Sequence, residues 1–88
     1  MSENSPRITS EQVRAARALL RWEQKDLAKH SGVSLPSIKR LETKPGPLAA
    51  YGATVEAIVG AFARAGVEFV EPNGKGAGVR YAGRDGPG

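Results

Sequence analysis

Several residue types are absent or scarce in this chain of 88 residues, and each absence excludes a class of function. It contains no cysteine, which excludes disulfide bonds, thiolate metal ligands and cysteine nucleophiles and is typical of a reducing compartment. Its lone histidine, His30, cannot build a metal site. No apolar run approaches the roughly 20 residues that span a bilayer, and the first residues lack the apolar stretch that is typical of a secretory signal. We therefore expect a cytoplasmic protein with no metal, no other cofactor and no membrane partner.

Catalytic constellations are missing as well. A chain of 88 residues forms one domain with a modest core. It shows no phosphate-binding loop, no paired carboxylates and no pairing of a nucleophile with a base. We expect a binding module and not an enzyme.

The net charge of +4 is concentrated in the first half of the chain. Residues 1–44 carry nine basic and five acidic side chains, so the whole surplus of four lies there, and the remainder balances. A local basic surplus is expected where a protein faces phosphates. An ordinary solvated surface has the same composition, so charge alone does not decide between the two.

Helical signals begin near Thr9. Gln12 follows three residues later, which is the spacing of a capping box, and apolar residues then recur at helical spacing, predicting a helix over 10–21. Ile8 is placed as a hydrophobic staple before it. A second short helix is predicted over 24–30, ended by Gly32.

Later helix signals are equally local. Ser34 as N-cap and Pro36 in the first turn predict a third helix over 35–42. Proline and glycine in 43–47 predict a loop, followed by a short turn. Thr54 is then predicted to cap a fourth helix, which Gly66 ends.

Beyond that helix the periodicity changes. Apolar and polar residues alternate around Phe69 and again around Val79, as in half-buried strands, and Asn73-Gly74 favours a turn between them. We predict a mainly α fold: a helical domain over 9–66 and a C-terminal β-hairpin over 67–82. Residues 1–8 are predicted to be a flexible arm and 83–88 a disordered tail.

The second and third predicted helices carry a recognisable set of residues at fixed spacing. They are Gln24, Leu27, Ala28, Gly32, Val33, Ser34, Ile38 and Glu42. This pattern resembles the Cro/CI-type (XRE) helix-turn-helix regulators, and the match extends over residues 13–62. The resemblance implies a lambda-repressor-like domain of four to five helices, whose third helix enters the major groove of DNA.

The resemblance also implies a role for individual residues. Base edges would be met by Leu35, Pro36 and Arg40. Phosphates would be contacted, or those contacts supported, by Gln24, Lys25, Ser37, Lys39 and Lys44. A structural ion pair would join Arg17 and Glu42. Of these, Arg40 is best suited to specificity, because its planar guanidinium can bond two acceptors of guanine together.

Two residues depart from the family pattern. Glu23 stands where a small hydroxyl or asparagine usually caps the second helix, and Arg21 stands where a glycine usually ends the first. Glu23 suits the helix dipole but repels a nearby phosphate, which Lys25 could offset.

The hairpin stands where the commonest family pattern continues with a fifth helix, and it resembles the tails of small bacterial regulators and HipB-like antitoxins. A two-stranded ribbon alone is marginal in water and leaves open edges. We therefore predict a homodimer that joins through Val55, Ile58, Val59, Phe62, Val67, Phe69, Val79 and Tyr81. The alternative is a hairpin folded back on its own fourth helix.

The leading hypothesis is a sequence-specific regulator of transcription that binds double-stranded DNA. We expect a homodimeric repressor at an inverted-repeat operator, which could include its own promoter. One alternative is an antitoxin with a toxin partner. Another is an interaction module that sequesters an activator protein, although the basic residues around the third helix favour DNA.

Overall fold

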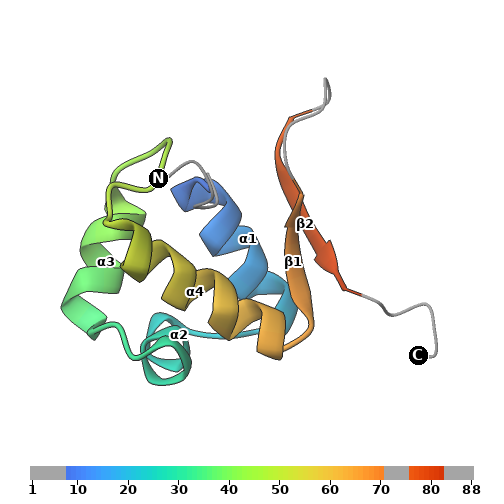
Figure 1. Cartoon of the computed structure of the whole chain (residues 1–88), viewed down its shortest axis with the longest axis horizontal. Coiled ribbons are helices and arrows are strands. Elements are labelled where there is room, and N and C mark those ends of the chain that lie inside the picture. Colours follow the sequence, from blue (N-terminus) through green and yellow to red (C-terminus); the bar gives the residue numbers. More distant parts are fainter. Residues whose placement is uncertain (1–7, 71–75, 83–88) are drawn as a thin grey trace.

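Four helices and two strands make up the part of the chain that the computed structural model describes, residues 8–70 and 76–82. In chain order they are α1 (Ser10–Leu20), α2 (Gln24–Ser31), α3 (Leu35–Thr43), α4 (Gly52–Arg64), β1 (Val67–Val70) and β2 (Gly78–Tyr81). The strands pair as an antiparallel hairpin, so the mainly helical class with a C-terminal hairpin is confirmed (Figure 1). Residues 1–7 of the predicted arm, the Asn73-Gly74 turn and the predicted tail lie outside the described residues. Ile8 was wrongly assigned to the arm, because it is 4% exposed and belongs to the core.

Helix α1 begins at the predicted capping box. The Thr9 hydroxyl accepts a hydrogen bond from Gln12 N at 3.1 Å, and Gln12 Oε1 accepts one from Thr9 N at 2.9 Å. The helix ends at Arg21, whose φ of 58° lies in the left-handed region that usually favours glycine. Arg21 therefore adopts the left-handed backbone conformation that a glycine usually supplies at this helix end.

Helices α2 and α3 also follow their local signals. The backbone N–H of Glu23 donates to Asp26 Oδ2 at 2.8 Å. A carboxylate on the first turn of α2 therefore supplies the hydrogen-bond acceptor for the N-cap residue. Gly32, with φ of 78°, ends α2 as predicted. Ser34 Oγ accepts from Ser37 N at 3.3 Å and caps α3.

The predicted start of α4 was wrong. The helix begins at Gly52 with Tyr51 as N-cap, so Thr54 lies inside the first turn instead of capping it. Tyr51 has extended backbone angles, and its carbonyl accepts the first helical bond from Val55 N at 3.0 Å, although its side chain makes no capping bond. Because the N-cap side chain makes no hydrogen bond, the start of α4 requires no particular capping residue and could not be located from the sequence.

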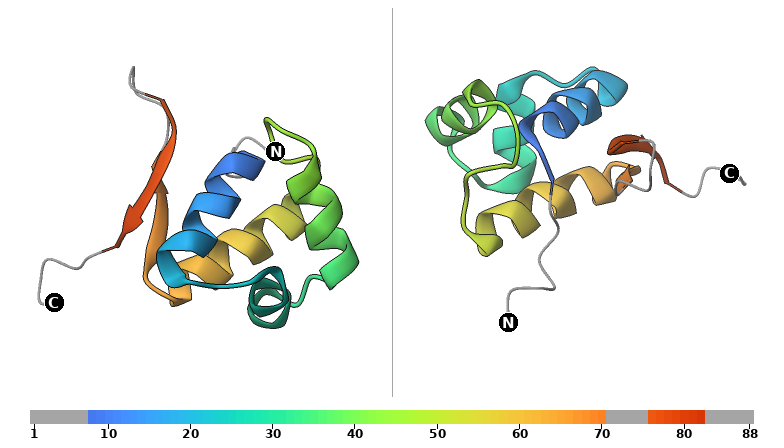
Figure 2. Two further views of the ribbon diagram at one scale, coloured as in Figure 1. Left: turned by 180° about the vertical axis from the view of Figure 1, so that it is seen from behind. Right: turned by 90° about the horizontal axis from the view of Figure 1, so that it is seen from above.

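The core lies where α4 crosses α1, α2 and the hairpin (Figures 1 and 2). Phe62, fully buried on α4, stacks on Trp22 with ring centroids 5.4 Å apart and meets Phe69 edge-on at 5.6 Å. Leu27 and Ile38 fill the space between α2 and α3. In the described part of the chain, no helix is both long and apolar enough to cross a membrane.

Part of the predicted dimer surface is instead buried in the core of the single chain. Val55, Ile58, Phe62 and Val67 are each at most 6% exposed within a single chain, because α2 and β1 cover that face of α4. They offer no free surface to a second copy. The hairpin folds back on its own α4 and on α1, which is the alternative arrangement.

The other predicted dimer residues keep some exposure. Val59, Phe69 and Val79 are half-buried against the core, and Tyr81 is 51% exposed while its hydroxyl donates to Leu19 O at 2.8 Å. On the opposite face of the hairpin Glu68 forms an ion pair with Arg80.

One buried amide fixes the hairpin to α1. Gln12, 5% exposed, uses its Nε2 to donate to Gly78 O at 2.9 Å and to Val70 O at 3.3 Å. Its Oε1 belongs to the capping box, so a single side chain holds both the start of α1 and the two strand ends.

Candidate nucleic-acid interface

A tight turn fixes α3 against α2. Gly32 N donates to Ala28 O at 2.9 Å, and Val33 N donates to Ser31 Oγ at 3.1 Å. Figure 1 views α2 nearly along its axis while α3 lies across the view, so the two helices cross steeply. On α3 the buried residues are Ile38, Leu41 and Glu42. The rest of the helix therefore presents one fixed face to solvent.

The predicted ion pair is present and forms the centre of a network. Glu42, 6% exposed, accepts from Arg17 Nε at 2.8 Å and from Arg17 Nη2 at 2.7 Å. Gln24 Nε2 donates to the same carboxylate at 3.1 Å. A buried charge is stable only when paired and hydrogen-bonded, and here α1 and α2 both supply donors to the end of α3.

Further bonds extend this network to the backbone. Arg17 Nη1 donates to Trp22 O at 3.0 Å, and Arg14 Nη1 donates to Glu42 O at 3.0 Å. Gln24 thus braces α3 through Glu42, which is the supporting role expected of it from the sequence. Only one N–H of its amide is needed for this bond, and the other remains able to donate to a ligand.

The outward face of α3 is cationic. Lys39 and Arg40 are exposed, as is Lys44 directly after the helix, and none of the three forms an ion pair within residues 8–70 and 76–82. The one acidic residue of α3, Glu42, points inward to Arg17. Burial of this carboxylate leaves positive charge without a neighbouring negative charge on the surface of the helix.

The remaining predicted contact residues differ in exposure. Pro36 is exposed, whereas Leu35 and Ser37 are half-buried. Ser37 Oγ accepts from Ser34 Oγ at 2.9 Å. Lys25 is exposed and lies 3.6 Å from Glu23, an open surface pair of the kind that contributes only about 0–1 kcal/mol.

Contacts with α1 position the loop after α3. Gly46 N donates to Glu11 Oε1 at 3.2 Å, Ser10 N donates to Gly46 O at 2.9 Å, and Leu48 N donates to Ile8 O at 2.9 Å. Hydrogen bonds from its own backbone N–H and from that of Gly46 lower the pKa of the Glu11 carboxyl. These bonds hold the loop that follows Lys44 against the start of α1.

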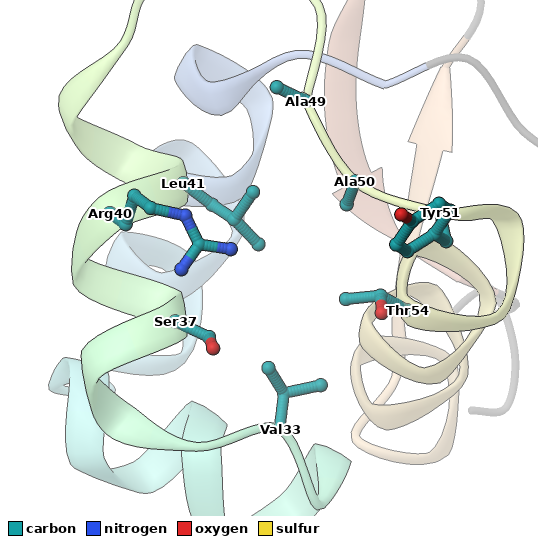
Figure 3. A pocket seen from close by; sticks show the side chains of 8 residues that line it. All are labelled: Val33, Ser37, Arg40, Leu41, Ala49, Ala50, Tyr51 and Thr54. Carbon is teal, nitrogen blue, oxygen red and sulfur yellow. The ribbon is translucent and has the colours of Figure 1, made fainter.

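Sequence reasoning missed a hollow between α3 and residues 49–54. It has a volume of about 380 Å³, and the Arg40 side chain extends from α3 toward it while Tyr51 lies on the opposite wall (Figure 3). No local pattern could have predicted it, because its walls come from segments that meet only in the folded chain. The small side chains of Ala49 and Ala50 are part of its lining.

Comparisons with family models, curated proteins and solved structures found no match to this chain. The function is therefore inferred from the chemistry and placement of its own residues.

Proposed function

We propose that this chain is a sequence-specific regulator that binds double-stranded DNA, a helix-turn-helix protein of the XRE type with α3 as its recognition helix. One observation carries the proposal: the outward face of α3 presents Lys39 and Arg40, with Lys44 directly after the helix, while the only carboxylate of α3, Glu42, is held inside. A major groove about 12 Å wide admits one helix, and its phosphate walls attract such a face.

The exposed side chains divide into two kinds of contact. Arg40 has the planar donor pair that bonds guanine O6 and N7, and Pro36 offers apolar contact to a thymine methyl. Lys39 and Lys44 are point charges suited to phosphates. Gln24 holds α3 in place through its bond to Glu42, and its amide has a second N–H that can donate to a phosphate.

We also propose that the active form is a homodimer and that it acts as a repressor at an inverted repeat. The surface left for the second copy is the hairpin, with its open strand edges and the exposed Tyr81. The hairpin and α3 lie at opposite ends of the molecule, which is 36 Å long (Figures 1 and 2). Copies joined through their hairpins therefore carry their α3 helices at the two outer ends, which favours half-sites separated by more than one helical turn of DNA.

The experiment is selection of bound duplexes from a random pool, followed by titration of the enriched sequence. We expect an enriched motif with two inverted half-sites. Binding to the duplex should exceed binding to random DNA by about 10³-fold or more. Equal affinity for all sequences would contradict sequence-specific regulation, and enrichment of a lone half-site would contradict the dimer.

A further inference from the structure

Two hollows lie along one flank of α3. The hollow that faces Tyr51 and a second one beside Lys44 each have a volume of about 380 Å³ and share Arg40, Leu41 and Ala49. Cavities of this size accommodate small organic molecules. We call this combined feature the Arg40 groove.

The lining of the Arg40 groove combines three chemistries. Its apolar walls are Val33, Leu41, Ala49 and Ala50. Hydroxyl groups come from Ser37, Thr54 and Tyr51. Cations lie at one side, with Lys44 beside Arg40.

Two of these groups are free to bind a ligand. The guanidinium of Arg40 makes no hydrogen bond or ion pair with any residue of the described segments. Tyr51 is 87% exposed and is the most exposed large hydrophobic residue in the described part of the chain. A planar cation and an open aromatic ring thus face one hollow of mixed polar and apolar lining from opposite sides (Figure 3).

We propose that the Arg40 groove binds a small aromatic carboxylate. The carboxylate accepts paired hydrogen bonds from Arg40, and the ring packs between Tyr51 and the apolar wall at Leu41. A bare phosphate would leave the apolar wall unused, and a neutral hydrocarbon would leave the guanidinium unused.

Binding has a consequence for DNA that rests on the proposed function. A ligand that holds the Arg40 guanidinium in the groove keeps it away from the guanine that it would read, so ligand and base compete for the position of one side chain. An aromatic carboxylate bound in the Arg40 groove therefore acts as an effector that releases the protein from DNA.

Binding is tested by NMR titration of the full ¹⁵N-labelled chain with benzoate, 1-naphthoate and 3-phenylpropanoate, each beside its neutral carboxamide. We expect saturable shifts around Arg40 and Tyr51 for at least one carboxylate and about tenfold weaker binding of its carboxamide. Arg40→Met should weaken the carboxylate about tenfold, and Tyr51→Ala about three- to tenfold. Lys39→Met is the matched control, because it removes a charge from the same helix outside the groove, and it should leave the affinity unchanged.

Three results would overturn the proposal. They are the absence of saturable binding by every carboxylate below about 10 mM, an equal loss in Arg40→Met and Lys39→Met, and inorganic phosphate binding at the same residues as tightly as the best carboxylate.

A separate titration distinguishes this inference from the proposed function. The best carboxylate should weaken binding to the selected duplex in proportion to its occupancy of the groove. A carboxylate that binds when no duplex binds refutes the DNA function and leaves the ligand site standing. Simultaneous binding of both without competition refutes the effector step.

Discussion

Replacement of Glu42 by alanine removes the acceptor at the centre of the network that joins α1, α2 and α3. The change leaves the Arg17 guanidinium without a counterion and frees one Gln24 donor. Breaking a buried pair costs about 3–5 kcal/mol, and we expect the lower end, about 3 kcal/mol, because water reaches the Arg17 side chain, which is 18% exposed. For a domain of this size the melting temperature should fall by about 12–24 °C.

The assay is urea unfolding at pH 7 followed by the fluorescence of Trp22, the single tryptophan of the chain. Glu56→Ala, on the exposed side of α4, is the matched control and should change the free energy of unfolding by less than about 0.5 kcal/mol. The double variant Arg17→Met with Glu42→Leu should recover much of the lost stability, because apolar replacement of a buried pair is often close to neutral. A loss below about 1 kcal/mol in Glu42→Ala would refute the reasoning.

Three further predictions concern the DNA surface and the loop beside it. Arg40→Ala should cost about 1–3 kcal/mol on the selected duplex and little on random DNA, as measured by fluorescence anisotropy, and equal losses on both would exclude it as a base-reading residue. Lys44→Ala should weaken binding to all duplexes alike and reduce the slope of log affinity against log salt by about 1, whereas an unchanged slope would place Lys44 outside the interface. Because the folded pKa of Glu11 lies below its ordinary value of 4.5, its carboxylate stabilises the fold above that pH, and the contribution is lost as the pH falls through the folded pKa. Unfolding titrations of the chain and of Glu11→Gln should therefore converge below pH 4.5, and a difference that is constant with pH would contradict the bond to Gly46.

Features set by neighbouring residues were predictable from the sequence. The Thr9 capping box, the Ser34 cap and the end of α2 at Gly32 each depend on atoms within a few positions. The start of α4 at Gly52 was missed because Tyr51 caps it through its backbone alone. A helix start that involves only backbone atoms cannot be recognised from the identity of the side chains.

Features set by packing were only partly predictable. Helical spacing on α4 correctly indicated that Val55, Ile58 and Phe62 are buried, but periodicity does not say against what. They pack inside their own chain, and the expected contact with a second copy was wrong for them. The Arg17–Glu42 pair and the bracing role of Gln24 were predicted from the sequence, whereas the choice of Glu42 as the acceptor of Gln24 and the groove beside Arg40 required the folded geometry.

The division of α3 into an inner and an outer face makes the helix suitable for redesign. Ile38, Leu41 and Glu42 hold it in place, while Pro36, Lys39 and Arg40 are exposed and accept changes that leave the fold intact. A library varied at the three outer positions should consist mostly of folded proteins. If α3 reads DNA, such a library is a source of new operator specificities on one unchanged scaffold, and its members would differ in their targets and not in their stability.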